Sequence, residues 1–294
     1  MNPTFLGFLA ILMWALLALF TAASGKVPPF QLLAMTFLVG GLIGVASWPF
    51  RKGVVTRLRL PAKVWIVGIA GLFGYHFFYY TALRNAPVAE ASLVAYLWPM
   101  LIVVGSALLP GERLRWFHLA GAACGFAGAA LLVTGKADAI GFTGSWLGYT
   151  SAIACALIWS SYSILSRSLK SAPSDAVAIY CLATAALSAV CHLVFETTVW
   201  PETQGQWLAV LGLGLMPVGL AFYVWDHGVK HGNIQFLGSA AYLAPLISTF
   251  ILVAAGFAAA TWQLAAAALL ITVGALVASG RLVGKDSCRD GESA

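Results

Sequence analysis

The sequence predicts an all-α integral membrane protein with ten transmembrane helices, arranged as two inverted five-helix repeats. Three observations lead to this fold class: the composition, ten long apolar segments and a motif that occurs twice. Of the 294 residues, 61% are hydrophobic and only 9% are charged, whereas a soluble domain has about 25% charged residues. A chain this apolar is expected in a lipid bilayer, because no soluble core of this size hides so much apolar side chain.

Ten apolar segments are long enough to cross a bilayer, which takes about 20 mostly apolar residues per helix. In chain order they are Phe5–Ala23, Phe30–Trp48, Val64–Leu83, Val88–Leu109, Phe117–Gly135, Trp146–Ser166, Ala176–Phe195, Trp207–His227, Ile234–Ala255 and Gln263–Val283. No Lys or Arg precedes the first segment, so we expect an uncleaved helix and not a secretion signal. The final residues, 285–294, are mostly small and polar, and we expect a disordered cytoplasmic tail there.

The motif that occurs twice contains a proline inside an apolar segment. Tyr96-Leu97-Trp98-Pro99 is followed 146 residues later by Tyr242-Leu243-Ala244-Pro245. A proline in the interior of a helix removes an i→i−4 hydrogen bond and interrupts the helix. We therefore expect one repeat in residues 1–138 and a second in residues 139–284.

The basic residues predict the orientation in the membrane. If the N-terminus is cytoplasmic, thirteen of the sixteen Lys and Arg residues lie on the cytoplasmic side, and only Lys26, Arg84 and Lys136 lie opposite. Cytoplasmic loops carry an excess of Lys and Arg, so both termini are expected in the cytoplasm. The net charge of +6 is assigned to this bias, and no nucleic-acid partner is predicted.

An odd number of helices in each repeat makes the second repeat enter the membrane in the opposite sense. Inverted repeats with interrupted helices are typical of transporters, whose substrate site lies near the bilayer midplane. The alternative is a duplication that only enlarged a helical bundle. The candidate hinges are glycines and prolines inside the predicted helices, because these residues weaken or kink a helix. They are Gly71, Gly74, Pro99, Pro217, Gly219 and Pro245.

Charged residues are scarce where a charged cargo would need them. Phe5 to Leu83 contains no Asp or Glu, and no Lys or Arg lies in the middle of a predicted span. Buried charges are costly and usually functional, so their absence favours an uncharged or zwitterionic cargo. The sequence contains no nucleophile elbow, phosphate loop or zincin motif and no cysteine pair with redox or metal spacing. It therefore predicts no enzyme, no cofactor, no metal site and no disulfide.

Aromatic residues deep in the predicted spans are the candidate cavity lining. A buried Tyr or Trp needs a hydrogen-bond partner, so such residues suit a wet pocket, although packing explains each of them singly. The candidates are Trp14, His76, Tyr79, Tyr80, Tyr96, Trp98, Trp159, Tyr162, Trp225 and Tyr242. For His76, a core histidine and a proton carrier both stay open.

Four charged or titratable residues near the ends of the spans are candidate gates. Arg84 and Glu90 lie near the outer end, and Asp226 and His227 lie near the cytoplasmic end. The alternative for each pair is a solvated position. Glu112, which precedes the fifth segment, is interpreted as structural.

The ten segments, the prolines in the fourth and ninth segments and Gly111-Glu112 resemble the drug/metabolite transporter superfamily. The half-repeat resembles its EamA-type unit, the resemblance covers about residues 5–283, and it looks closest to the YddG-type aromatic amino acid exporters. The second repeat has Phe257-Ala258 where the first has Gly111-Glu112. The Gly-Glu pair is thus absent from the second repeat, which puts a packing or capping contact in doubt there.

The resemblance implies a central cavity enclosed by the first, third, fourth, sixth, eighth and ninth helices, with alternating access. It also implies export of aromatic amino acids and related small metabolites across a bacterial inner membrane. Two other functions remain in competition. A multidrug or small organic cation exporter would need a buried carboxylate, for which Glu90 is the candidate, and a membrane-embedded enzyme or lipid-handling protein would need a catalytic cluster. Cargo range, proton coupling and oligomeric state stay open, with a monomer among the options.

Overall fold

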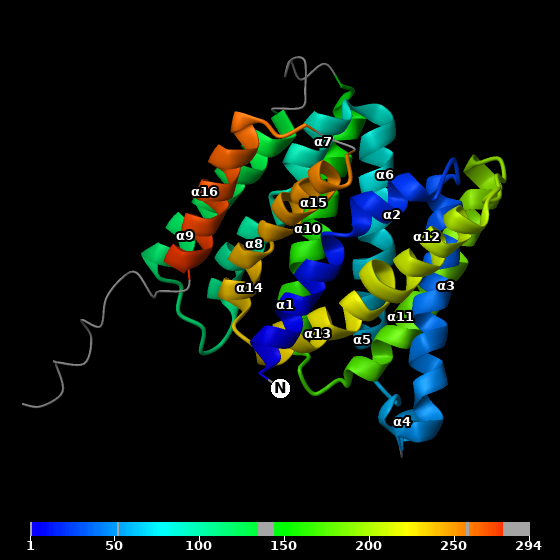
Figure 1. Cartoon of the computed structure of the whole chain (residues 1–294). Helices are drawn as coiled ribbons and strands as arrows, with labels where there is room; N and C mark the ends of the chain where they lie inside the picture. Colours follow the sequence, from blue (N-terminus) through cyan, green and yellow to red (C-terminus); the bar gives the residue numbers. More distant parts are fainter. Residues whose placement is uncertain (1, 52, 135–143, 257–258, 279–294) are drawn as a thin grey trace, which may run out of the picture.

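The computed structural model describes residues 2–51, 53–134, 144–256 and 259–278 (Figure 1). All regular secondary structure in these ranges is helical, which confirms the all-α prediction for the described residues. The predicted tail 285–294, the predicted boundary between residues 138 and 139, the Phe257-Ala258 pair and the end of the tenth predicted segment lie outside the described residues.

The helices follow the predicted segments, with several interruptions inside them. The first half contains α1 (Pro3–Trp14), α2 (Leu17–Ala23), α3 (Pro29–Ser47), η1 (Trp48–Phe50), α4 (Val54–Arg57), α5 (Ala62–Ile69), η2 (Ala70–Gly74), α6 (Tyr75–Asn85), α7 (Val88–Ala95), α8 (Trp98–Gly105), η3 (Ser106–Leu108) and α9 (Trp116–Thr134). The second half contains α10 (Trp146–Ser168), η4 (Ser174–Ala176), α11 (Val177–Phe195), α12 (Gln204–Leu215), η5 (Met216–Leu220), α13 (Ala221–His231), α14 (Ile234–Ala240), α15 (Leu243–Ala254) and α16 (Trp262–Ala278).

Eight helical stretches among the described residues are long and apolar enough to cross a membrane. They are Pro3–Ala23, Pro29–Phe50, Ala62–Asn85, Val88–Leu108, Trp116–Thr134, Ser174–Phe195, Gln204–His231 and Ile234–Ala254. Two more of the predicted segments are helical but fall short: α10 carries several serines and Arg167, and the described part of α16 is a shorter apolar helix. The structure therefore supports a multi-pass helical protein, and the number ten stays a prediction.

The interruptions recur at the offset found in the sequence. The π-helical turns η2 and η5 begin at Ala70 and Met216, which are 146 residues apart. A π-helical turn inserts an extra residue into an α-helix and often marks a functional site. The break between α7 and α8 and the break between α14 and α15 also lie at matching positions. The sequence did not predict the π-helical turns, although four of the six candidate hinges lie in them.

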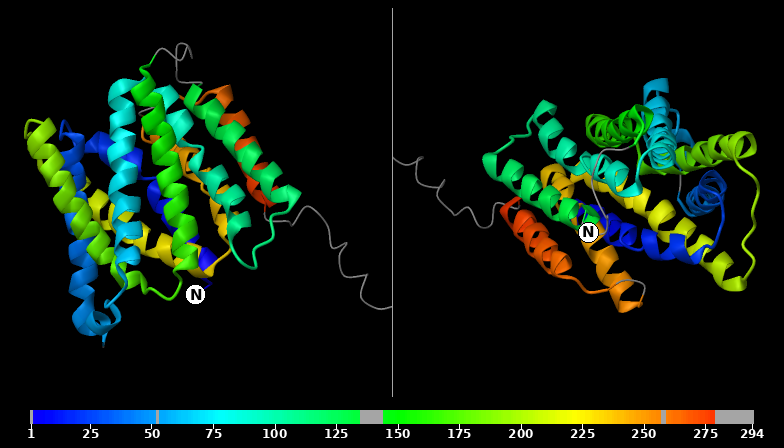
Figure 2. Two further views of the ribbon diagram at one scale, coloured as in Figure 1. Left: turned by 180° about the vertical axis from the view of Figure 1, so that it is seen from behind. Right: turned by 90° about the horizontal axis from the view of Figure 1, so that it is seen from above.

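The helix pairings are arranged symmetrically. α9 packs against α16 and α3 packs against α11, and these two pairs lie on opposite sides of the central helices (Figures 1 and 2). In the centre, α1 packs against α13, and α6 packs against α10. Exchanging each helix for its counterpart in the other half turns the first central pair into the second.

Glycines allow the central helices to approach closely. A Cβ atom on Gly228 of α13 would lie 2.4 Å from the Cα atom of Gly7 in α1, and a Cβ on Gly40 would lie 2.8 Å from the Cα of Gly219. Small residues at such crossings let backbones pack directly in a membrane, where packing drives helix association. The close crossing of α1 and α13 brings Trp14, which follows Gly7, close to Trp225, which precedes Gly228.

Candidate functional site

Four tryptophans from four helices form one cluster, named the tryptophan cluster below. Trp14 ends α1, Trp98 begins α8, Trp159 lies in α10 and Trp225 lies in α13. All six pairs are in contact, with ring centroids 5.0 to 6.3 Å apart. Two of the rings come from each half of the chain, so this cluster joins the halves.

Two indole groups of this cluster have hydrogen-bond acceptors, one of them in an interrupted helix. The indole N–H of Trp14 donates to the carbonyl of Pro217 at 3.1 Å, inside the η5 turn, and the indole N–H of Trp225 donates to Ser163 Oγ at 3.2 Å. A π-helical turn leaves a carbonyl available to such a partner. Because Ser163 accepts its indole N–H, Trp225 can be fully buried without an unsatisfied polar atom.

A second group of aromatic side chains follows α6 and reaches the tryptophan cluster through Tyr75. The ring of Tyr75 lies 5.4 Å from that of Trp159 and stacks on Tyr79 at 5.9 Å. His76 Nδ1 lies 2.7 Å from the carbonyl oxygen of Leu72. Because a carbonyl only accepts hydrogen bonds, Nδ1 carries the proton and donates it. Tyr75 was not among the predicted residues, although it stands four residues before Tyr79 on the same helical face.

The tyrosines beside these groups divide between two clusters. The ring of Tyr162 packs against that of Trp159 in a tilted arrangement, with centroids 5.2 Å apart, and belongs with the tryptophans. Tyr242 is fully buried and packs against Phe126 of α9 in a separate apolar cluster. Its hydroxyl donates to the carbonyl of Tyr96 at 3.2 Å, which is its own repeat counterpart. The structure does not bring Tyr242 to the tryptophans, whereas the half-buried Tyr80 continues the α6 row and packs on Phe30.

The candidate hinges lie at the interruptions. Gly71 and Gly74 are in η2, and Pro217 and Gly219 are in η5. Pro99 and Pro245 lie in the first turns of α8 and α15. An apolar groove of about 550 Å³ runs along η2 and α10 and is bordered by both glycines. No residue in this set is shown to bend.

Asp226 pairs with Lys230 and not with His227. The Lys230 Nζ lies 2.8 Å from Asp226 Oδ2 and 3.0 Å from the carbonyl of Ala172. Ser174 Oγ also donates to the carboxylate, at 2.6 Å. Asp226 is 0% exposed and Lys230 4%, so the solvated alternative is wrong for Asp226. His227 lies against His231 instead, with ring centroids 4.8 Å apart.

Arg84 pairs with Glu196, and the predicted partner Glu90 accepts a hydrogen bond from Tyr149. Arg84 Nη2 lies 2.6 Å from Glu196 Oε1. The same carboxylate accepts the backbone N–H groups of Phe30 and Gln31 at 3.1 Å, at the start of α3. A helix N-terminus attracts negative charge. Glu196 could have been suspected from the sequence, since it directly follows an apolar segment.

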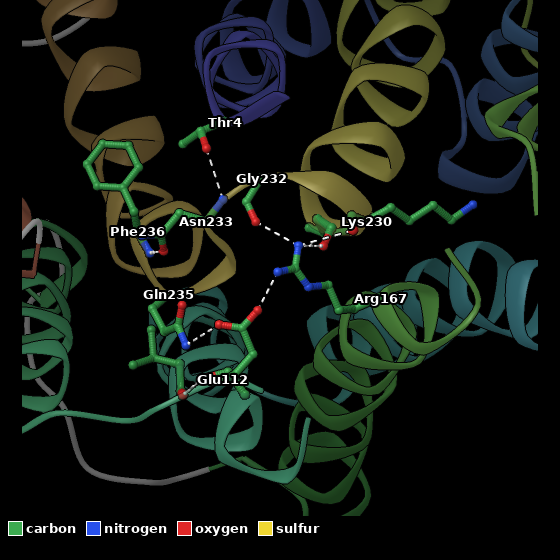
Figure 3. A network of polar contacts seen from close by, with 11 residues as sticks. Thr4, Glu112, Arg167, Lys230, Gly232, Asn233, Gln235 and Phe236 are labelled. Carbon is green, nitrogen blue, oxygen red and sulfur yellow. Dashed lines mark hydrogen bonds and ion pairs between the residues drawn. The ribbon is translucent and has the colours of Figure 1, made fainter. Parts of the chain in front are cut away.

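Arg167 connects the end of α10 to the end of α13 and to the segment before α9 (Figure 3). Its guanidinium pairs with Glu112, and Nη1 donates to the carbonyls of Val229, Lys230 and Gly232 at 3.2, 3.1 and 2.7 Å. Gln235 donates to the other Glu112 oxygen at 3.0 Å. The structural interpretation of Glu112 fits these contacts, but the sequence did not identify Arg167.

Comparison with known proteins places the chain in a family. The model of the EamA-like transporter family matches residues 2–134 and 146–280. An aromatic amino acid exporter YddG of Ancylobacter novellus is 54% identical over 279 residues, covering 95% of this chain and 97% of that protein. The protein of the same name in Escherichia coli is 24% identical and covers 94% of this chain and 96% of its own length. A solved crystal structure that is 54% identical superposes with a TM-score of 0.89, covering 94% of this chain and 98% of that one. The chain therefore belongs to the EamA-like transporter family and is a transporter rather than an enzyme.

Proposed function

We propose that this transporter exports aromatic amino acids and related small metabolites across a bacterial inner membrane. The observation that carries the proposal is the tryptophan cluster, which draws on both halves of the chain and continues into the tyrosines of α6. The name of the 54% identical relative supports the same cargo. Lipid and a small-molecule cargo are the partners that this function needs.

An aromatic amino acid offers groups that this site can bind. Its ring packs on other rings, and its ammonium group gains about 0.5–2 kcal/mol over a Trp or Tyr face. Its carboxylate can accept hydrogen bonds from tyrosine hydroxyls. We place the cargo against Trp14, Trp98 and Trp159, with Tyr75, His76, Tyr79, Tyr80 and Tyr96 beside it. Trp225 and Tyr162 pack against these rings, and Tyr242 has a packing role in the separate apolar cluster.

For the topology, we propose ten spans in two inverted repeats, with α10 and α16 as the remaining two and both termini in the cytoplasm. The repeats are residues 1–138 and 139–284. The matching π-helical turns and the exchange symmetry of the helix pairs support this arrangement. Alternating access then consists of one half rocking against the other, with bending at η2, η5 and the two prolines.

The test is transport by purified protein in liposomes. Labelled phenylalanine, tryptophan, alanine and a quaternary ammonium compound are compared, with and without a pH gradient. We expect saturable flux of the two aromatic amino acids, less flux of alanine and little of the ammonium. A gradient that drives the flux would point to His76 and Glu90 as proton carriers.

Variants connect the flux to the site. Trp98→Ala should reduce aromatic flux at least tenfold, and Trp98→Phe should reduce it less, because the phenyl ring keeps part of the contact. The matched control is Trp116→Ala, since Trp116 is 65% exposed and lies outside the cluster. Equal flux in Trp98→Ala and Trp116→Ala would contradict the proposed site. Flux of the ammonium alone would favour the organic cation exporter instead.

A further inference from the structure

The two ends of the central helices differ in how tightly they are closed. At the end that carries the N-terminus, α10 packs along α13, and Trp225 and Asp226 are 0% exposed. At the opposite end, the corresponding stretch of the first span is α2, which packs against α12 and α15. Tyr79 and Tyr80 of α6 are only half-buried there. The N-terminal end is therefore the more tightly closed of the two.

Arg167 holds this closed end together. The last carbonyls of a helix lack partners within the helix and carry partial negative charge. A guanidinium presents several N–H donors in one plane, and that of Arg167 reaches the carbonyls that end α13 as well as Glu112. One side chain thus ties α10 to α13 and to the segment before α9, at the place where Thr4 Oγ1 accepts the backbone N–H of Asn233 (Figure 3).

The cations that end α6 and α13 correspond to each other in the two repeats, although their carboxylate partners do not. Arg84 at the end of α6 and Lys230 at the end of α13 are 146 residues apart, and each pairs with a carboxylate. If the two halves exchange conformations, one such cation still lies at each end of the central helices. These two cations are therefore present at both ends in either form.

The Arg167–Glu112 contact has no counterpart. The position 146 residues before Arg167 is Thr21, and the position 146 residues after Glu112 is Ala258. Neither of these corresponding positions in the sequence carries a charged side chain. Hydrogen bonds to charged groups are stronger than those between neutral groups, so the closed N-terminal end has a stabilising contact that the other end lacks.

We propose that Arg167, with Glu112, is a lock that makes the form closed at the N-terminal end the resting form of the transporter. This inference rests on the proposed alternating access, not on the identity of the cargo. With the N-terminus in the cytoplasm, the transporter rests open to the outside and must break this contact before it can load cargo from the cytoplasm. Arg167 is a positioning residue and does not touch the cargo.

The experiment measures distances between pairs of spin labels in lipid nanodiscs by pulsed electron paramagnetic resonance, without any cargo. One label pair, at Arg113 and Lys170, reports on the N-terminal end. The other, at Lys26 and Thr261, also has one label in each half and reports on the opposite end. All four positions are exposed, and the native cysteines are first replaced.

Arg167→Gln should add a longer distance at the first pair and a shorter one at the second. We expect at least a tenfold change in the ratio of the two forms, which corresponds to about 1.4 kcal/mol. Glu112→Gln should shift the ratio in the same direction but less, because Arg167 keeps its carbonyl acceptors. Arg59→Gln, at an exposed position on the same side, should change neither distance.

Unchanged distances in both Arg167→Gln and Glu112→Gln would overturn the lock. So would a change confined to the Arg113–Lys170 pair, since a local loosening of the loop gives that result. If Arg167→Gln does not fold, Arg167→Lys and Glu112→Gln decide the question. Liposome flux of the same variants separates the two proposals, because a lock shown by the distances survives even if the cargo is not an aromatic amino acid.

Discussion

The buried pair of Asp226 and Lys230 allows a sharp test of how the protein tolerates charge inside a span. The two residues lie one turn apart on α13, with the ammonium 2.8 Å from the carboxylate. The ammonium also donates to the carbonyl of Ala172, and the carboxylate also accepts from Ser174. Replacing Lys230 by Met keeps most of the side-chain volume and removes the charge, so Asp226 is left buried without its cation.

The expected loss follows from desolvation rather than from the strength of the pair. Removing one partner of a buried pair costs about 3–5 kcal/mol, because the remaining charge is uncompensated. Ser174 still donates to the carboxylate, so we expect a loss near the lower end of this range for Lys230→Met. Replacing both members by apolar residues is often neutral, so Lys230→Met with Asp226→Leu should be more stable than Lys230→Met alone.

The assay is unfolding of the purified protein in mixed micelles of increasing SDS fraction, followed by tryptophan fluorescence. The four variants of a double-mutant cycle give the coupling free energy between the two positions. Lys63→Met serves as the control, since Lys63 is exposed, and it should lie within about 0.5 kcal/mol of the native protein. If the double variant is less stable than Lys230→Met, the reasoning from desolvation is refuted.

Three further predictions use other parts of the structure. Gly228→Ala should destabilise the protein by about 1–3 kcal/mol, because its Cβ meets the backbone of α1. Gly205→Ala should not, since the nearest neighbour of its Cβ lies 3.8 Å away. The same SDS titration measures both variants. Pro99→Ala and Pro245→Ala should slow aromatic flux in liposomes, because they stiffen the helices. The half-saturating concentration should change little, because the pocket stays the same. Unchanged rates in both variants would argue against hinges there. Glu90→Gln should leave phenylalanine flux intact, and loss of all flux would assign Glu90 a role in transport itself.

The sequence alone identified a membrane protein, the approximate positions of its helices and a proline motif that occurs twice. Apolar length is a local property, so it can be read from each segment without its neighbours. The offset between Pro99 and Pro245 likewise located the interruptions in the fourth and ninth segments. It also agreed with the offset of the π-helical turns, whose existence no local pattern revealed.

Only the tertiary structure decided which side chains meet. The sequence identified Trp14, Trp98, Trp159 and Trp225 one by one, but their contact depends on the close crossing of helices from both halves. It also identified Arg84, without its partner Glu196, 112 residues away. The Arg84–Glu196 pair and the tryptophan cluster form between helices, and their geometry is fixed by packing that no single segment encodes.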